Sequence, residues 1–142
     1  MKKHRFKYKT WHQPVAHPQM ATFHCRRCKK ALTPPLTLVT NTELLCPKEG
    51  CSLVPNGLYW PVGTGQDFEG QFAVSLTDVS CTGYHLDLRR LLGCCGPSGT
   101  SGRNRVCNCG GEVGTERSDC IWPHAVYLDP SQILAVVPEG TQ

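Results

Sequence analysis

The stretch "CCGPSGTSGRNRVCNCGG", residues 94–111, places four of the ten cysteines of the chain in a loop with almost no apolar side chain to bury. A loop of Gly, Ser, Asn and Pro cannot build a hydrophobic core, so disulfides or a metal ion are the means left to order it. Closing such a loop costs only a few kcal/mol of entropy, whereas a structural zinc site returns on the order of 10–16 kcal/mol. The stretch therefore predicts that bound metal decides the fold here.

The cysteines around this stretch and upstream of it form four pairs with ligand-like spacing. Cys25 and Cys28 form the C-x2-C of a zinc knuckle in "FHCRRCKK", and "CPKEGC" (46–51) turns at a Pro and a Gly. In "VCNCGG" (106–111) the two cysteines point to the same side of an extended strand, and "GCCGP" (93–97) is typical of a turn. The predicted zinc ligands are Cys25, Cys28, Cys46, Cys51, Cys94, Cys95, Cys107 and Cys109. They would hold two structural zinc ions, each in four thiolates.

Spacing does not decide which pairs share an ion. Neighbours in sequence are the simplest partners, but a crossed arrangement that joins Cys25 and Cys28 to Cys107 and Cys109 is a serious rival. Cys81 and Cys120 are left over and are expected as small buried hydrophobes. The substitute ligands we considered are Cys120, His24 and His124. The alternative for the whole set is a framework of up to five disulfides.

Composition favours a soluble cytoplasmic domain over a secreted or membrane protein. The 142 residues are 39% hydrophobic, enough for a modest core. The basic start of the chain leads into no apolar run of signal-peptide length, and no window has the ~18 apolar residues of a membrane span. In a reducing compartment clustered cysteines hold metal more often than they form disulfides.

Five short segments rich in β-branched and aromatic residues are bounded by Pro, Gly, Asn or Asp. We expect strands at 36–40, 57–62, 71–79, 124–128 and 132–137. Residues 84–92, "YHLDLRRLL", are the one candidate for a short helix, although a strand would fit them as well. The prediction is a mainly β fold of short antiparallel strands with long loops.

Basic residues are concentrated at the N-terminal end of the chain. Residues 1–30 carry nine Lys or Arg and no carboxylate, and Phe6, Tyr8 and Trp11 lie among them. We assign residues 1–20 to a basic tail and residues 21–142 to a single domain. A basic, aromatic segment is able to contact phosphates and stack on unpaired bases. The candidate nucleic-acid contacts are Lys2, Lys3, Arg5, Lys7, Lys9, Arg26 and Arg27.

Aromatic residues suggest a second kind of site. Trp60, Trp122 and Tyr84 could line a pocket for a flat or cationic ligand, although aromatic side chains in small β domains more often fill the core.

The paired cysteines resemble zinc ribbons in general. The wide gap between "CRRC" (25–28) and "VCNC" (106–109) also resembles the yippee-like, or β-tent, domains. That resemblance implies two knuckles that clamp two sheets through one zinc, the crossed partition of the cysteines, and a shallow pocket at the sheet ends. The match is imperfect because the second knuckle is C-x-C.

These observations predict a non-catalytic zinc-binding β domain that acts as an interaction module. A protein is the expected partner, with nucleic acid second and no membrane. Four-thiolate sites are closed and electron-rich, and none of the common catalytic motifs occurs, so no catalytic residue is predicted. The alternatives are a zinc- or thiol-dependent enzyme, or a redox or metal sensor that uses Cys94 and Cys95.

Overall fold

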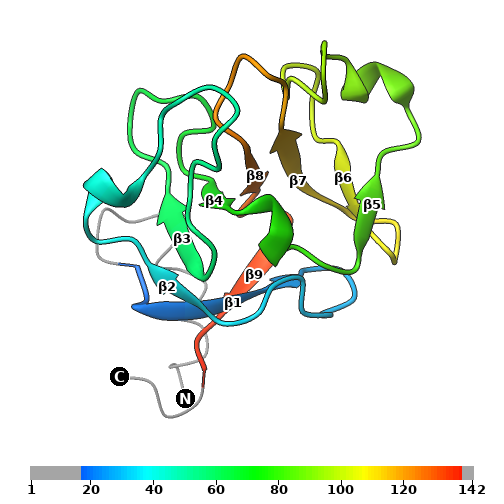
Figure 1. Cartoon of the computed structure of the whole chain (residues 1–142). Helices are drawn as coiled ribbons and strands as arrows, with labels where there is room; N and C mark the ends of the chain where they lie inside the picture. The colour runs from blue at the N-terminus through cyan, green and yellow to red at the C-terminus, as the bar shows by residue number, and fades with distance from the viewer. Residues whose placement is uncertain (1–16, 139–142) are drawn as a thin grey trace.

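The computed structural model describes residues 17–138, which form nine short strands joined by long loops (Figure 1). The strands are β1 (Met20–Cys25), β2 (Leu36–Leu38), β3 (Leu58–Pro61), β4 (Phe72–Val74), β5 (Thr82–Tyr84), β6 (Arg105–Cys107), β7 (Glu112–Arg117), β8 (Ala125–Leu128) and β9 (Ile133–Val136). Within residues 17–138 the chain also forms three single-turn 3-10 helices, η2 (Thr42–Leu44), η3 (Leu76–Asp78) and η4 (Leu88–Leu91). The prediction of a mainly β fold is confirmed.

All nine strands pair in one sheet with the order β5-β6-β7-β8-β4-β3-β2-β1-β9. Every neighbouring pair is antiparallel except β2 and β3, which run parallel. The strand β1 is next to one end of this order and β6 is next to the other. The metal-ligand candidates Cys25 and Cys107 are the last residues of these two strands.

The five expected strand segments contain β2, β3, β4, β8 and β9. Residues 71–79 end in η3 rather than in strand, because the Ser75 side chain accepts the Thr77 N–H and starts a tight turn. The stretch 84–92 forms the end of β5 and the single turn η4, which Asp87 caps at its N-terminus. In the described residues no helix is long and apolar enough to cross a membrane.

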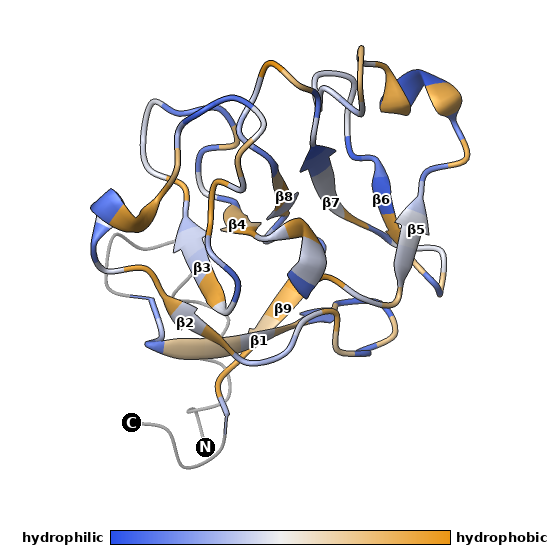
Figure 2. Cartoon of the chain, viewed as in Figure 1, coloured by the Kyte–Doolittle hydropathy of each residue, from blue (hydrophilic) through white to orange (hydrophobic). Residues whose placement is uncertain are grey.

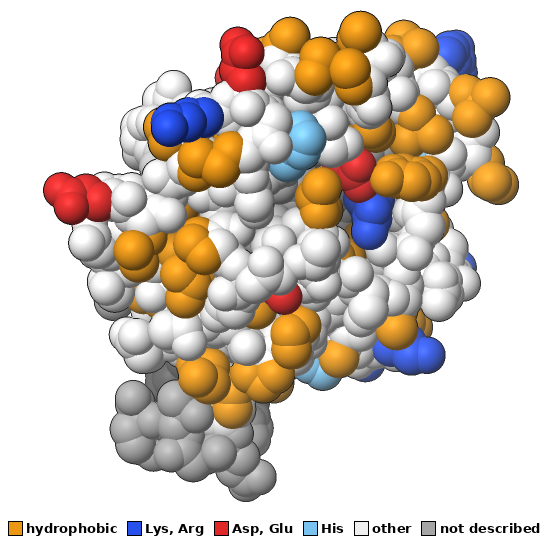
Figure 3. Space-filling model, in the orientation of Figure 1, with side chains coloured by type: hydrophobic (Ala, Val, Ile, Leu, Met, Phe, Trp, Pro, Cys, Tyr) orange, Lys and Arg blue, Asp and Glu red, His pale blue; other side chains and the backbone are white. Residues whose placement is uncertain are grey.

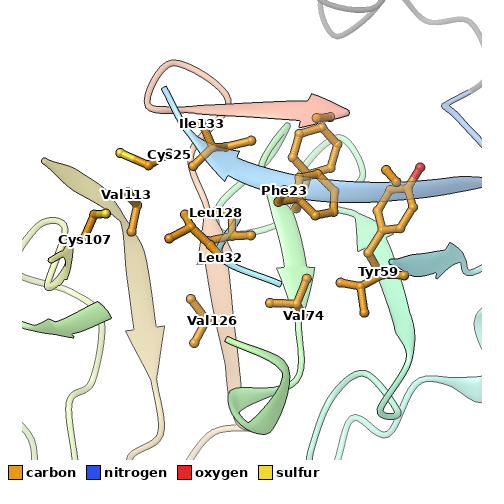
Figure 4. Close-up of a cluster of buried hydrophobic side chains, with 14 residues drawn as sticks. Phe23, Cys25, Leu32, Tyr59, Val74, Cys107, Val113, Val126, Leu128 and Ile133 are labelled. Carbon is orange, nitrogen blue, oxygen red and sulfur yellow. The ribbon is translucent and has the colours of Figure 1, made fainter. Parts of the chain in front are cut away.

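Two groups of buried side chains lie on opposite faces of the central strands. Within β8, Val126 and Leu128 belong to the larger group and Ala125 and Tyr127 to the smaller, as strand alternation requires. The larger group contains Cys25 and other buried side chains of β1, β6, β7 and β9 (Figure 4). Figure 2 shows apolar residues on β4 and β9 and also along η4 and several loops, whereas β7 ends in polar residues. The basic tail falls largely outside the described residues.

Candidate metal centres

Four sulfur atoms from two turns distant in sequence lie together in the structure. The Sγ atoms of Cys25, Cys28, Cys107 and Cys109 all lie within 4.8 Å of one another. The Sγ–Sγ distance is 3.6 Å both from Cys25 to Cys109 and from Cys28 to Cys107. Around a zinc ion with Zn–S bonds of about 2.3 Å, tetrahedral sulfurs are about 3.8 Å apart. The four-cysteine group therefore has the spacing of a tetrahedral thiolate site.

The two turns present their cysteines with the same backbone pattern. The N–H of the first cysteine, Cys25 or Cys107, donates to the carbonyl that closes the turn, at 2.9 and 2.8 Å. Its carbonyl accepts the N–H of the residue after the second cysteine, Lys29 or Gly110, at 2.8 Å in both turns. These two residues have φ of 69° and 98°, so each turn closes through a left-handed residue. The C-x-C turn is a C-x2-C knuckle shortened by one residue.

The first cysteine of each turn is buried in the core, and the second is less buried. Cys25 and Cys107 are buried, whereas Cys28 is exposed and Cys109 is partly buried against the core. Burial raises the pKa of the Cys107 thiol to about 12, and the backbone N–H of Gly111 lowers the pKa of Cys109 to about 7. A bound cation would supply the positive charge that a buried Cys107 thiolate needs.

The four-cysteine group connects the two ends of the sheet order. Figure 4 shows Cys25 and Cys107 turned toward each other beside Val113 and Ile133. All four of these residues belong to the same buried group. An ion at this position would tie β1 to β6 where no backbone ladder joins them. This is the crossed arrangement of the cysteines.

Cys46 and Cys51, expected as metal ligands, are instead bonded to each other in a disulfide. The short "CPKEG" turn brings their sulfurs together, and they belong to neither cysteine group. This pair therefore forms a covalent cross-link that closes the short turn between residues 46 and 51, in place of a metal site.

A second group contains Cys94, Cys95 and Cys120, whose Sγ atoms also lie within 4.8 Å of one another. Cys120, expected either as a spare residue or as a substitute ligand, thus joins the vicinal pair. Cys81 belongs to neither group and packs at the edge of the larger core. All three members of the three-cysteine group are exposed.

The two histidines considered as ligands are used elsewhere. His24 precedes Cys25 in β1, so strand alternation turns it to the opposite face, where its Nδ1 lies 2.9 Å from the Lys29 carbonyl. The Nε2 of His124 lies 3.2 Å from the Asp119 carbonyl oxygen. Neither histidine belongs to a cysteine group.

Protein side chains, rather than metal alone, order the loop that precedes β6. The carboxylate of Asp119 accepts the N–H groups of Cys94, Cys95 and Cys120 at 3.1, 3.0 and 2.7 Å. The guanidinium of Arg117 donates to the Ser98 carbonyl at 2.8 Å. Sequence reasoning missed both roles; the only signal was an Asp directly before a cysteine, a residue type that often binds nearby backbone N–H groups.

The aromatic pocket forms in part. Trp60 and Trp122 line one cavity of about 530 Å³ together with Tyr127. The Arg117 guanidinium lies 4.0 Å from the centre of the Trp122 ring, so the protein's own cation covers one of its faces. Tyr84 lies elsewhere, and its hydroxyl donates to the Glu116 carboxylate.

Of the candidate nucleic-acid contacts, the structure describes Arg26 and Arg27. The Arg26 guanidinium donates to the carbonyl oxygens of Pro130 and Ile133, both at 3.1 Å, and so holds the start of β9. Arg27 lies with Cys25 along a cavity of about 390 Å³ beside the four-cysteine group. Lys2, Lys3, Arg5, Lys7 and Lys9 lie outside the described residues.

Comparisons of the chain with protein-family models, with curated proteins and with solved structures give no match. The chemistry of the site therefore rests on its residues. Closely spaced thiols bind soft or borderline metal ions, bond to one another as disulfides, or exchange between these states.

Proposed function

We propose that the protein is a zinc-stabilised, non-catalytic β domain that acts as an interaction module. The observation that carries this proposal is the four-cysteine group, whose sulfurs have tetrahedral spacing and bridge the two ends of the sheet. Zinc is the ion that four thiolates in two knuckles suit best, because it accepts tetrahedral sulfur ligands and has no redox chemistry. A yippee-like arrangement, with two distant knuckles that share one zinc, agrees with this geometry.

A structural role is supported by the ligand count. Four sulfurs complete a tetrahedral zinc ion and leave no coordination position for substrate. Near the second group, the His124 Nε2 lies against the Asp119 backbone carbonyl rather than a cysteine sulfur, and the Asp119 carboxylate accepts the N–H groups of Cys94 and Cys95. These contacts support a binding function over a zinc or thiol enzyme.

The first experiment is elemental analysis of the purified chain with zinc-edge X-ray absorption. We expect a tightly held zinc ion with four sulfur ligands that is lost in Cys28→Ser and Cys109→Ser. A chain without zinc, in which mass spectrometry shows the four cysteines as disulfides, would remove the proposal.

A protein is the expected partner because the η4 region exposes apolar side chains. Leu86 and Leu88 are 95% and 73% exposed, and Leu92 is 60% exposed. Figure 3 shows hydrophobic side chains gathered at the upper right of the molecule, over η4. Quantitative affinity purification from the source cells tests this role. Leu88→Asp should lose a partner that Leu44→Asp, a change at an exposed leucine of η2, retains.

Nucleic acid is the second candidate partner. The basic residues of the first knuckle, residues 25–30, support it. Arg27 lines the cavity beside the four-cysteine group, and Lys29 and Lys30 line a hollow on its solvent side. Titration of fluorescent single-stranded DNA and RNA at low salt checks this. Binding whose salt dependence flattens when Arg27, Lys29 and Lys30 are neutralised would support it, and no binding at tens of micromolar would exclude it.

A further inference from the structure

We propose that Cys94, Cys95 and Cys120 form a second metal site of a different kind, which binds one exchangeable soft cation, copper(I). The three sulfurs lie within 4.8 Å of one another and come from two segments that β6 and β7 separate in sequence. Thiolates are the protein ligands that select soft ions such as copper(I).

The site is preformed by the protein. The Asp119 side chain fixes the backbone of all three cysteines, because its Oδ1 accepts the N–H of Cys95 and Cys120 and its Oδ2 accepts the N–H of Cys94. The chain also passes close to itself at Gly93, where a Cβ would lie 1.7 Å from the Gly96 carbonyl oxygen. A metal ion is therefore not required to shape this loop, in contrast to the four-cysteine group that bridges separate strands.

The ligand count selects the ion. Within the described part of the chain, the group offers three ligand atoms, all sulfur. Both Asp119 carboxylate oxygens accept backbone N–H groups, and the His124 Nε2 lies against the Asp119 carbonyl at 3.2 Å. A tetrahedral zinc ion would need a fourth ligand from solvent. Copper(I), a d10 ion that is stable with three sulfurs, needs none.

Exposure makes the bound ion exchangeable. Cys94, Cys95 and Cys120 are all exposed, whereas two ligands of the four-cysteine group are buried. An incoming thiolate from another molecule can therefore reach a copper ion at the three-cysteine group directly. Transfer between thiolates moves the ion without changing its oxidation state, so it needs no oxidant or reductant.

The test uses the full zinc-loaded chain under argon, with its disulfide intact. Copper(I) is supplied as its acetonitrile complex against a colorimetric copper(I) chelator, and copper and zinc are counted in the recovered protein. We expect one copper per chain, no loss of zinc, and a copper-edge absorption spectrum with three sulfur neighbours.

Single substitutions assign the ligands. Cys94→Ser and Cys120→Ser should each weaken copper(I) binding at least tenfold while zinc content stays unchanged, and Cys81→Ser, the matched control, should bind copper like the wild type. Two exposed positions are tested independently, so a folding defect in one variant does not decide the result.

Three results would overturn the proposal. They are copper binding that survives both substitutions, copper that enters only by displacing zinc, and a four-coordinate zinc at Cys94, Cys95 and Cys120 that copper(I) does not replace. Zinc content of the unloaded wild type reports separately on the four-cysteine group, so failure here is distinguishable from failure of the zinc-stabilised domain.

Discussion

At the scale of single residues, buried charged side chains hold the loops in place, because the loops have few apolar side chains to pack. Glu116 and Arg117 are 4% and 6% exposed, and Asp119 is 5% exposed. Each has several polar partners; Glu116, for example, accepts from Arg105 at 2.7 Å. A buried charge is tolerated only when it is paired and hydrogen-bonded, so these side chains fix the loops that contact them.

Asp119→Asn should destabilise the protein, because an amide presents one acceptor oxygen where the carboxylate uses two. At least one of the N–H groups of Cys94, Cys95 and Cys120 would then face the amide NH2 and lose its acceptor. We expect the midpoint of thermal unfolding to fall by several degrees. Asp67→Asn, at a side chain that is 69% exposed and bonds to Arg117, should change it little. Equal midpoints for the two variants would contradict this role of Asp119.

The sequence predicts the ligand residues better than it predicts what orients them. Cys25 and Cys28 are recognisable because C-x2-C spacing is set by one local turn. Asp119 gives no such signal, since its partners Cys94 and Cys95 come from a distant loop. The expectation that Cys46 and Cys51 bind metal was wrong because a turn that brings two sulfurs together serves a metal ion and a disulfide equally well.

At the scale of elements, the sequence patterns missed the strands β1, β5, β6 and β7, and β7 gives the clearest reason. The strand β7, "EVGTER", buries Glu116 and Arg117 and contains a glycine, so it resembles an exposed loop in composition. The strands β2, β3, β4, β8 and β9 were found because apolar and β-branched side chains dominate them. Burial of charge depends on tertiary partners, which short-range patterns do not contain.

Gly114→Ala in β7 should be strongly destabilising. A Cβ at this position would lie 2.3 Å from the Tyr127 carbonyl oxygen of β8, so the two paired strands would have to separate. We expect a loss of about 2 kcal/mol or more in the free energy of unfolding, measured by denaturant titration. Gly83→Ala, in β5 with no atom within 4 Å of the new Cβ, is the matched control. Similar losses for both would show that the β7–β8 approach is looser than described.

Cys28→Ser should release the zinc ion that we propose at the four-cysteine group and lower stability by several kcal/mol, because the binding energy of a structural zinc site is folding energy. Cys81→Ser should do little, since Cys81 belongs to neither cysteine group. Zinc content and chemical unfolding of the two variants provide the measurement. A Cys81 variant as unstable as the Cys28 variant would refute this assignment of the cysteines.

At the scale of the whole molecule, the order of the strands follows from pairings that no local pattern specifies. The strand β1 pairs with β9 at the far end of the chain, and β4 pairs with β8 across three intervening strands, β5, β6 and β7. The sequence therefore predicts the fold class and several of the strands, but not the sheet order. The crossed arrangement, in which Cys25 and Cys28 share an ion with Cys107 and Cys109, is one of the alternatives that the cysteine spacing leaves open.

Removal of the metal should loosen the two ends of the sheet before its centre. The strands β4 and β8 are buried on both faces, whereas β1 and β6 approach each other through the four-cysteine group. Hydrogen exchange after chelation should show lost protection in β1 and β6 while β4 and β8 stay protected. Uniform loss of protection, or none, would argue against an ion that ties the sheet ends together.

The most direct test of the central claim is anomalous diffraction at the zinc edge from crystals of the full chain. The proposed zinc site predicts one peak among Cys25, Cys28, Cys107 and Cys109, with four sulfurs at about 2.3 Å from it. Absence of that peak, with the sulfurs joined as Cys25–Cys109 and Cys28–Cys107 disulfides, would contradict the claim that a metal ion closes this fold.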